Sequence, residues 1–219
     1  MHETDADIVE CGYYQKGKGV CQEYPKQYEI LTGRKQILAE HLRKKVSFLV
    51  WNKLYRSDLI KEIRFEEGAE YEDVLWTCEV LTHTEKIASV QQPLYNWRIR
   101  SGSISRRNFD ERNFKALDHF YERSKKLESI PDKGIKALAK ASCITQCYLE
   151  LSNATQTKDI ELIKKAREHS FCIFKNSLLN VIDFVKLCPL KSKMAYLYFC
   201  LMYRKVLIEA SHLVTAAKN

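Results

Sequence analysis

The sequence predicts an α/β region with few strands, followed by a mostly helical region. Three observations lead to this fold class. Only seven Gly and four Pro occur among 219 residues, which is few for an all-β protein rich in turns. Strand-like and helix-like segments alternate up to about residue 108. Beyond that point apolar residues recur at helical spacing, so we divide the chain into regions 1–108 and 109–219.

The N-terminal region is expected to begin with a strand, because "DADIVECGYY" is rich in strand-forming residues. A helix is predicted over "LTGRKQILAEHLRKK", with Thr32 as its N-cap. The next segment is expected to start extended, from Val46 to Trp51, and then to turn helical. A further helix is predicted over "YEDVLWTCEVL", and two short strands, "KIASV" and "PLYNWRIR", are expected around Pro93.

Four helices are predicted in the C-terminal region, over 109–127, 132–151, 157–174 and from 181 onward. The last of them is basic, because residues 186–219 carry six Lys or Arg and one Glu, a balance of +5. Aromatic residues are interleaved with these charges, which favours an amphipathic helix lying on an anionic membrane surface. A core helix with solvated lysines at its ends is the alternative interpretation.

Composition excludes some classes of protein. The chain has 36 Lys+Arg against 28 Asp+Glu, but the charge is spread out and no nucleic-acid-binding motif occurs, so we expect no nucleic-acid partner. The eight cysteines form no Cys-x-x-Cys pair, which indicates reduced thiols in a cytoplasmic protein. The acidic start lacks the order of a signal peptide, and the longest apolar run, Met194 to Tyr203, is too short to span a bilayer. We therefore expect a cytoplasmic protein that associates at most peripherally with the inner face of the plasma membrane.

An acidic segment, "FEEGAEYEDVLW", stands out in this basic chain. Carboxylates in a first helical turn stabilise the helix dipole, which is sufficient reason for most of them. Glu72 and Asp73 differ because they lie at the junction where the apolar helix face begins. A carboxylate held there can face a cleft and act as a general base. An acidic helix start without catalysis remains the alternative.

Several short motifs in a fixed order carry a family resemblance. They are "WNKLY" at 51–55, "RF" at 64–65, "ED" at 72–73, "PLY" at 93–95 with Arg98, and "SIS" at 103–105. Together they resemble bacterial family 2 glycosyltransferases, GT-A-fold (Rossmann-like) enzymes that build capsule, exopolysaccharide and lipopolysaccharide chains. The resemblance covers roughly residues 6–108, and the helical region matches only in general character.

The resemblance implies an inverting transfer from a nucleotide-sugar donor to a saccharide or lipid-linked acceptor. Asp73 would be the catalytic base, with Glu72 as its neighbour in the family's Glu-Asp pair. Trp51, Asn52 and Lys53 would lie near the sugar. The resemblance also implies that three further residues lie near the diphosphate or on a loop closing over it: Arg98, Ser101 and Ser103. Core packing for Trp51 and a solvated strand end for Arg98 are the open alternatives.

The sequence departs from the family pattern at its start. A complete enzyme of this family carries an N-terminal nucleotide-binding half with an Asp-x-Asp motif for Mg or Mn. The only literal match is Asp5-Ala6-Asp7, in the stretch where the family has a later strand, so we expect no metal site in this chain. We therefore expect residues 1–108 to be the acceptor-side half of a truncated enzyme that is inactive alone. A non-catalytic remnant or binding partner is the alternative. A partner chain or self-association would cover the sheet edges left exposed.

Overall fold

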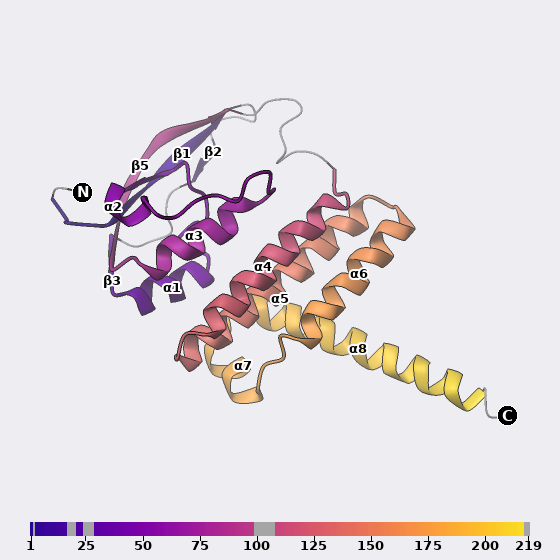
Figure 1. Cartoon of the computed structure of the whole chain (residues 1–219). Helices are drawn as coiled ribbons and strands as arrows, with labels where there is room; N and C mark the ends of the chain where they lie inside the picture. Colours follow the sequence, from indigo (N-terminus) through magenta and orange to yellow (C-terminus); the bar gives the residue numbers. More distant parts are fainter. Residues whose placement is uncertain (2, 17–20, 24–28, 99–107, 217–219) are drawn as a thin grey trace.

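The computed structural model describes residues 1, 3–16, 21–23, 29–98 and 108–216. It confirms a small sheet with helices, followed by a helical region (Figure 1). The strands of the α/β part are β1 (Ile8–Lys16), β2 (Cys21–Glu23), β3 (Ile30–Thr32), β4 (Lys53–Tyr55) and β5 (Lys86–Arg98). Its helices are α1 (Arg34–Leu42), α2 (Ser57–Ile60) and α3 (Glu72–Thr82). The helical region contains α4 (Arg112–Glu128), α5 (Lys133–Gln156), α6 (Ile160–Lys175), α7 (Val181–Leu187) and α8 (Leu190–Ala216).

The sheet is built around β1 and β5, which run parallel. The strand order is β2-β1-β5-β3, and β4 also pairs with β1. The β2, β3 and β4 strands pair in the antiparallel sense. Helices α1 and α3 lie together beside the sheet (Figure 1), and their apolar side chains bury Ile8 and Ile87 completely.

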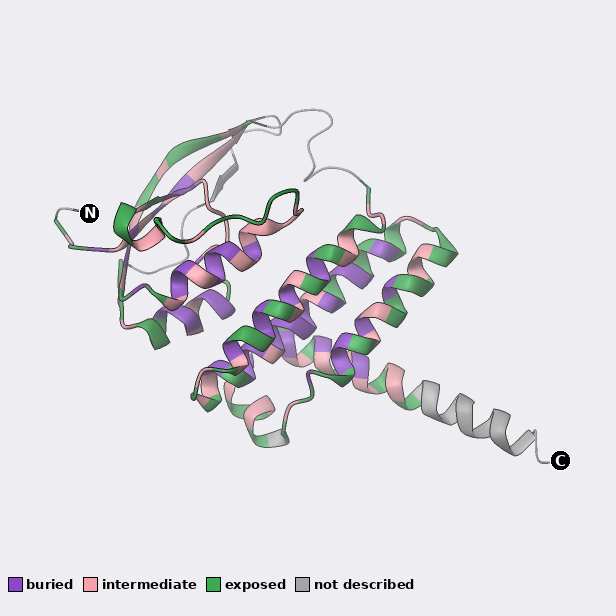
Figure 2. Ribbon diagram, viewed as in Figure 1, coloured by how far each residue is buried: buried purple, intermediate pink, exposed green. Residues whose placement is uncertain are grey.

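One hydrophobic core joins the sheet to the helical region. Leu38 of α1 and Leu81 of α3 belong to the same buried cluster as Leu127, Ile135 and Leu138 of α4 and α5. A second cluster fills the helical region and includes Ile144 of α5, Phe174 of α6 and Phe199 of α8. Buried residues line the inner faces of α4 and α5 in Figure 2. The predicted helical periodicity thus corresponds to real buried faces.

Two short strands predicted around Pro93 are one strand, β5. Pro93 cannot donate a ladder hydrogen bond, so it is normally confined to edges or bulges. Here it lies opposite Gly12, where the β1–β5 register shifts on both sides. From Cys11 to Tyr13, β1 advances by two residues while β5 advances from Val90 to Tyr95, so the irregularity lies in β5 around the proline, and the ladder then continues to Arg98.

Three further expectations about local structure were wrong. The N-cap of α1 is Gly33, with φ of 89°, because Thr32 is paired with Lys86 in β3. The segment expected to turn helical after Trp51 instead enters the short strand β4, and the helix α2 begins only at Ser57; before it, the backbone N–H of Ser47 donates to Glu10 Oε1 (3.3 Å). The helix predicted from Val181 onward is split by Pro189, which cannot continue α7 and precedes the first residue of α8.

Candidate functional site

Asp73 lies in the first turn of α3, after a residue with an unusual backbone conformation. The N-cap residue Tyr71 has φ of 61°, in the left-handed region that bulky side chains rarely adopt. Helix α4 holds it there. Asn113 Nδ2 donates to Tyr71 Oη (3.1 Å), and His119 Nδ1 lies 3.2 Å from the Tyr71 carbonyl oxygen. Such enforced conformations concentrate at functional sites, and Asp73 follows this one by two residues.

The pKa of Asp73 is raised to about 6. Burial is the largest cause, and repulsion from Glu72 adds to it. Hydrogen bonds from the backbone N–H groups of Val74 and Asp73 and the charge of Lys53 act in the opposite direction. A carboxylate with a pKa near neutrality is matched to general-base catalysis, because it is ionised at pH 7 and still basic enough to accept a proton.

Asp73 faces a cleft of about 1350 Å³ between the sheet and the helical region. One wall is aromatic, with Trp51 at its centre. The ring centroid of Trp51 lies 4.8 Å from Tyr13, 4.5 Å from Tyr95 and 6.1 Å from Trp97. Flat apolar rings of this kind can pack on the face of a sugar ring.

The opposite wall comes from the helical region and is polar. It includes Asn113 of α4, Glu150 and Asn153 of α5, and Asp159 at the start of α6. With Glu72 and Asp73, the cleft is lined by several carboxylates and amides. The carboxylates and amides form hydrogen bonds with hydroxyls, and the carboxylates repel phosphates. The geometry therefore suits a neutral, hydroxyl-rich ligand.

Glu150 is a site residue that the sequence predictions missed. It is only 7% exposed, and burial raises the pKa of its carboxyl group. Gln146 Nε2 donates to its Oε1 (2.8 Å). The available signal was its position as the one acidic residue of α5, between Leu149 and Leu151, because a lone buried acid needs partners.

Asn52 and Lys53, predicted near the sugar, lie instead in a buried polar network behind the aromatic wall. Lys53 Nζ pairs with Glu10 Oε1 (3.3 Å) and donates to the Leu49 carbonyl oxygen (2.5 Å). Asn52 Nδ2 donates to the Cys11 carbonyl oxygen (3.0 Å). Neither lines the Asp73 cleft, although Trp51 and Leu49 beside them do. Their observed contacts hold the cleft wall in place, and sugar binding by them stays a prediction.

One further predicted residue, Arg98, is not brought to the cleft. Arg98 is exposed at the end of β5 and does not line the cleft, and Ser101 and Ser103 lie outside the described residues. Asp7 Oδ2 accepts from the backbone N–H groups of Glu85 (2.8 Å) and Lys86 (2.9 Å). Asp5 pairs with Arg56. The carboxylates of the literal Asp-x-Asp match therefore hold the segment before β1 against the start of β5 and against Arg56.

Comparison with known proteins relates the chain to glycosyltransferases. No family model matches it. It is 23% identical over 138 residues to the uncharacterized glycosyltransferase YibD of Escherichia coli K12, covering 58% of this chain and 40% of YibD. It is 39% identical over 56 residues to the glycosyltransferase GlyA of Streptococcus pneumoniae serotype 4, covering 26% of this chain and 8% of GlyA. The chain thus spans less than half the length of either relative.

A solved structure shares the fold. The crystal structure of Staphylococcus aureus TarS 1–349 in complex with UDP-GlcNAc matches with a TM-score of 0.57 at 16% sequence identity. The match covers 93% of this chain and 61% of the TarS chain. The arrangement of sheet and helices described here is therefore one found in a protein that binds a nucleotide-sugar.

Proposed function

We propose that the chain is the acceptor-side part of an inverting family 2 glycosyltransferase with a GT-A fold, acting in cell-surface polysaccharide synthesis. The observation that carries this proposal is the environment of Asp73. A carboxylate with a pKa of about 6 faces a large cleft that has one aromatic wall and one polar wall. The similarity to glycosyltransferases in sequence and fold supports the same class of reaction.

In the proposed reaction Asp73 accepts the proton of an acceptor hydroxyl. The oxygen attacks the anomeric carbon of the donor sugar, and the bond from that carbon to the diphosphate breaks. A nucleoside diphosphate leaves with the electron pair, and a single displacement inverts the anomeric configuration. Glu72 raises the basicity of Asp73 through its charge. Trp51 would orient the sugar by stacking.

The donor proposed for a first test is UDP-GlcNAc, because TarS 1–349 was crystallised with it. The described residues offer nothing suited to the Mg or Mn ion of the family, since they contain no group of three His, Cys, Asp or Glu able to hold one. We therefore propose that nucleotide and metal are bound by a half supplied outside these 219 residues, and we assign no step to the metal here.

Membrane association of the C-terminal helix is part of the proposal. Among the described residues, no helix is both long and apolar enough to cross a bilayer. Helix α8 nevertheless exposes four apolar side chains at helical spacing: Leu190, Met194, Leu197 and Leu201. Its other face is buried through Ala195 and Phe199. An exposed apolar stripe with Lys191, Lys193 and Arg204 nearby suits an anionic membrane carrying a lipid-linked acceptor.

The test begins with the DNA upstream of the Met1 codon. If it encodes nucleotide-binding strands and a metal motif, the joined chain is assayed for transfer from UDP-GlcNAc, alongside the Asp73→Asn variant. We expect this variant to lose transfer while it keeps nucleotide binding. Unchanged transfer would remove the base assignment. Nucleotide binding without transfer in the unsubstituted joined chain would favour the alternative, a non-catalytic binding protein.

A further inference from the structure

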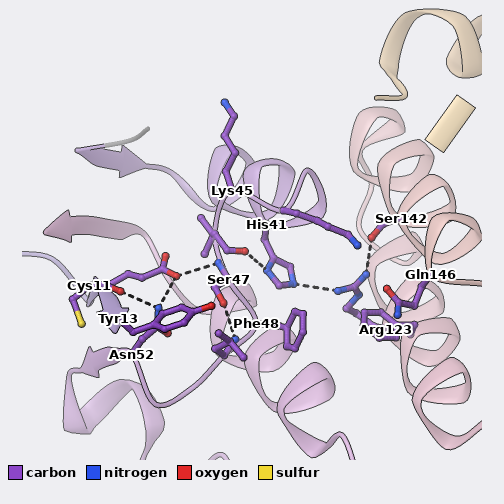
Figure 3. Close-up of a pocket in the computed structure, with 15 residues that line it drawn as sticks. Cys11, Tyr13, His41, Lys45, Ser47, Phe48, Asn52, Arg123, Ser142 and Gln146 are labelled. Atoms are coloured by element: carbon purple, nitrogen blue, oxygen red, sulfur yellow. Dashed lines mark hydrogen bonds between the residues drawn. The ribbon is translucent and has the colours of Figure 1, made fainter. Parts of the chain in front are cut away.

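A second and smaller cavity lies where the α/β part meets the helical part. Its volume is about 170 Å³. Figure 3 shows His41 and Ser47 on one side and Arg123 and Ser142 on the other. Phe48 and Leu49 line both this cavity and the Asp73 cleft, so the two spaces share a wall.

Arg123 of α4 is the unusual residue in this cavity. It is 3% exposed, and its guanidinium lies 4.7 Å from the ring centroid of Phe120. Its Nη2 donates to Ser142 Oγ (2.8 Å), and its Nη1 lies 3.4 Å from His41 Nε2 (Figure 3). The Nε–H group is buried and has no hydrogen-bond partner. A buried N–H without a partner is costly and rare.

The charge of Arg123 is also unbalanced. No carboxylate among the described residues forms an ion pair with it, and its other polar neighbours are neutral. His41 is neutral because burial, and then the charge of Arg123, lower its pKa to about 3. His41 Nδ1 lies 3.1 Å from the Val46 carbonyl oxygen, so it carries the proton, and Nε2 accepts from Arg123. An uncompensated buried cation is strongly unfavourable.

The remaining charged groups of the cavity do not supply the missing counter-charge. Glu10 is neutralised by Lys53, with Nζ 3.3 Å from Oε1. Lys45 pairs with Glu40 (2.6 Å). Arg123 therefore brings to the lining of the cavity a buried guanidinium without a carboxylate partner in the described part of the chain.

We propose that this cavity binds a small oxyanion of the phosphate class, with Arg123 as its principal ligand. A guanidinium donates several N–H groups in one plane, which matches the oxygens of a phosphate. The volume admits inorganic phosphate or the terminal phosphoryl group of a larger molecule. The site rests on the geometry of these residues and not on the proposed transferase activity. Because its ligands come from both parts of the chain, the anion would tie them together.

The test is calorimetric titration of the whole chain with inorganic phosphate, at constant ionic strength. We expect saturable binding that Arg123→Met weakens at least tenfold. Lys115→Met is the matched control, because it removes the same charge from an exposed position of the same helix. Its affinity should equal that of the unsubstituted chain. No saturable heat with millimolar phosphate and with glucose 1-phosphate, or equal affinity in Arg123→Met, would overturn the proposal.

Two additions make the test decisive. Arg123→Lys keeps the positive charge but loses the planar guanidinium. We expect this variant to fold and to bind phosphate more weakly than the unsubstituted chain, and an unchanged affinity would contradict the role assigned to Arg123. Glucose 1-phosphate separates the two sources of the ligand. Tighter binding of this ester than of phosphate would identify a phosphoryl group of a larger molecule, and the reverse order would identify the free ion. Circular dichroism spectra establish that each variant is folded.

Discussion

Replacing Asp73 by Asn removes a charge that the folded state disfavours. In the folded chain the pKa of this carboxyl is raised from 3.8 to about 6, first by burial and then by Glu72. A pKa difference of about two corresponds to about 3 kcal/mol of unfolding free energy. Asp73 is partly exposed, so solvent screening reduces the effect to about 1–2 kcal/mol.

The sign follows from the direction of the pKa change. A carboxyl whose pKa is raised on folding favours the folded state below its unfolded pKa, and this contribution is lost as pH rises through the folded pKa. The Asp73→Asn variant should therefore match the unsubstituted chain below about pH 4 and exceed its stability by about 1–2 kcal/mol above about pH 6. Most of the change should occur between these two values.

Urea unfolding followed by tryptophan fluorescence, at about pH 4 and about pH 7.5, measures both limits. Glu67→Gln is the control, because it neutralises an exposed carboxylate in the loop before α3 and should change stability by less than about 0.5 kcal/mol. Equal stabilisation by Asp73→Asn at both pH values would refute the electrostatic reasoning and indicate a packing effect of the amide. Destabilisation at the higher pH would show that the ionised carboxylate supports the fold.

Four further substitutions test other parts of the structure. Glu10→Ala should lower the unfolding free energy by about 3–5 kcal/mol, because it leaves the Lys53 charge buried and unpaired; urea unfolding measures it, and a loss below about 1 kcal/mol would contradict the buried pair. Phe199→Ala should lower the unfolding free energy by about 3–5 kcal/mol in the same assay, since this ring is fully buried. A loss as small as that of an exposed side chain would place α8 outside the core. Trp51→Ala should raise KM for the acceptor in the joined enzyme more than it lowers kcat, and initial rates with unchanged KM would argue against stacking. Leu201→Asp should abolish co-sedimentation with anionic vesicles at low salt, and vesicle binding unaffected by it would exclude this face of α8.

Much of the fold could be predicted from periodicity, because strands and helices with one buried face leave a regular apolar pattern. The parts that were missed depend on distant partners. The continuity of β5 through Pro93 depends on pairing with Gly12 of β1, some eighty positions earlier in the chain. The strands β2 and β3 are three residues long, too short to produce a pattern.

The candidate site, too, was only partly predictable from local sequence patterns. The junction position of Asp73 was visible in the sequence, because the acidic segment ends where the apolar face of α3 begins. The burial of Lys53 was not, because its partner Glu10 lies on another strand. The unpaired Arg123 was also hidden, since nothing in its helical pattern reveals that the surrounding groups are neutral.

The shared core has an evolutionary consequence. Because Leu81 of α3 packs in one cluster with Leu127 and Leu138 of the helical region, a change of volume on one of these surfaces has to be matched on the other. Joining residues 1–108 of this chain to the helices of a distant relative would combine two surfaces that do not fit each other in one core. The poorer packing would lower the stability of the recombinant. Diversification of what the cleft accepts is therefore expected to proceed by substitutions along the polar wall of α5 and α6, where Asn153 and Asp159 reach the cleft without belonging to that core.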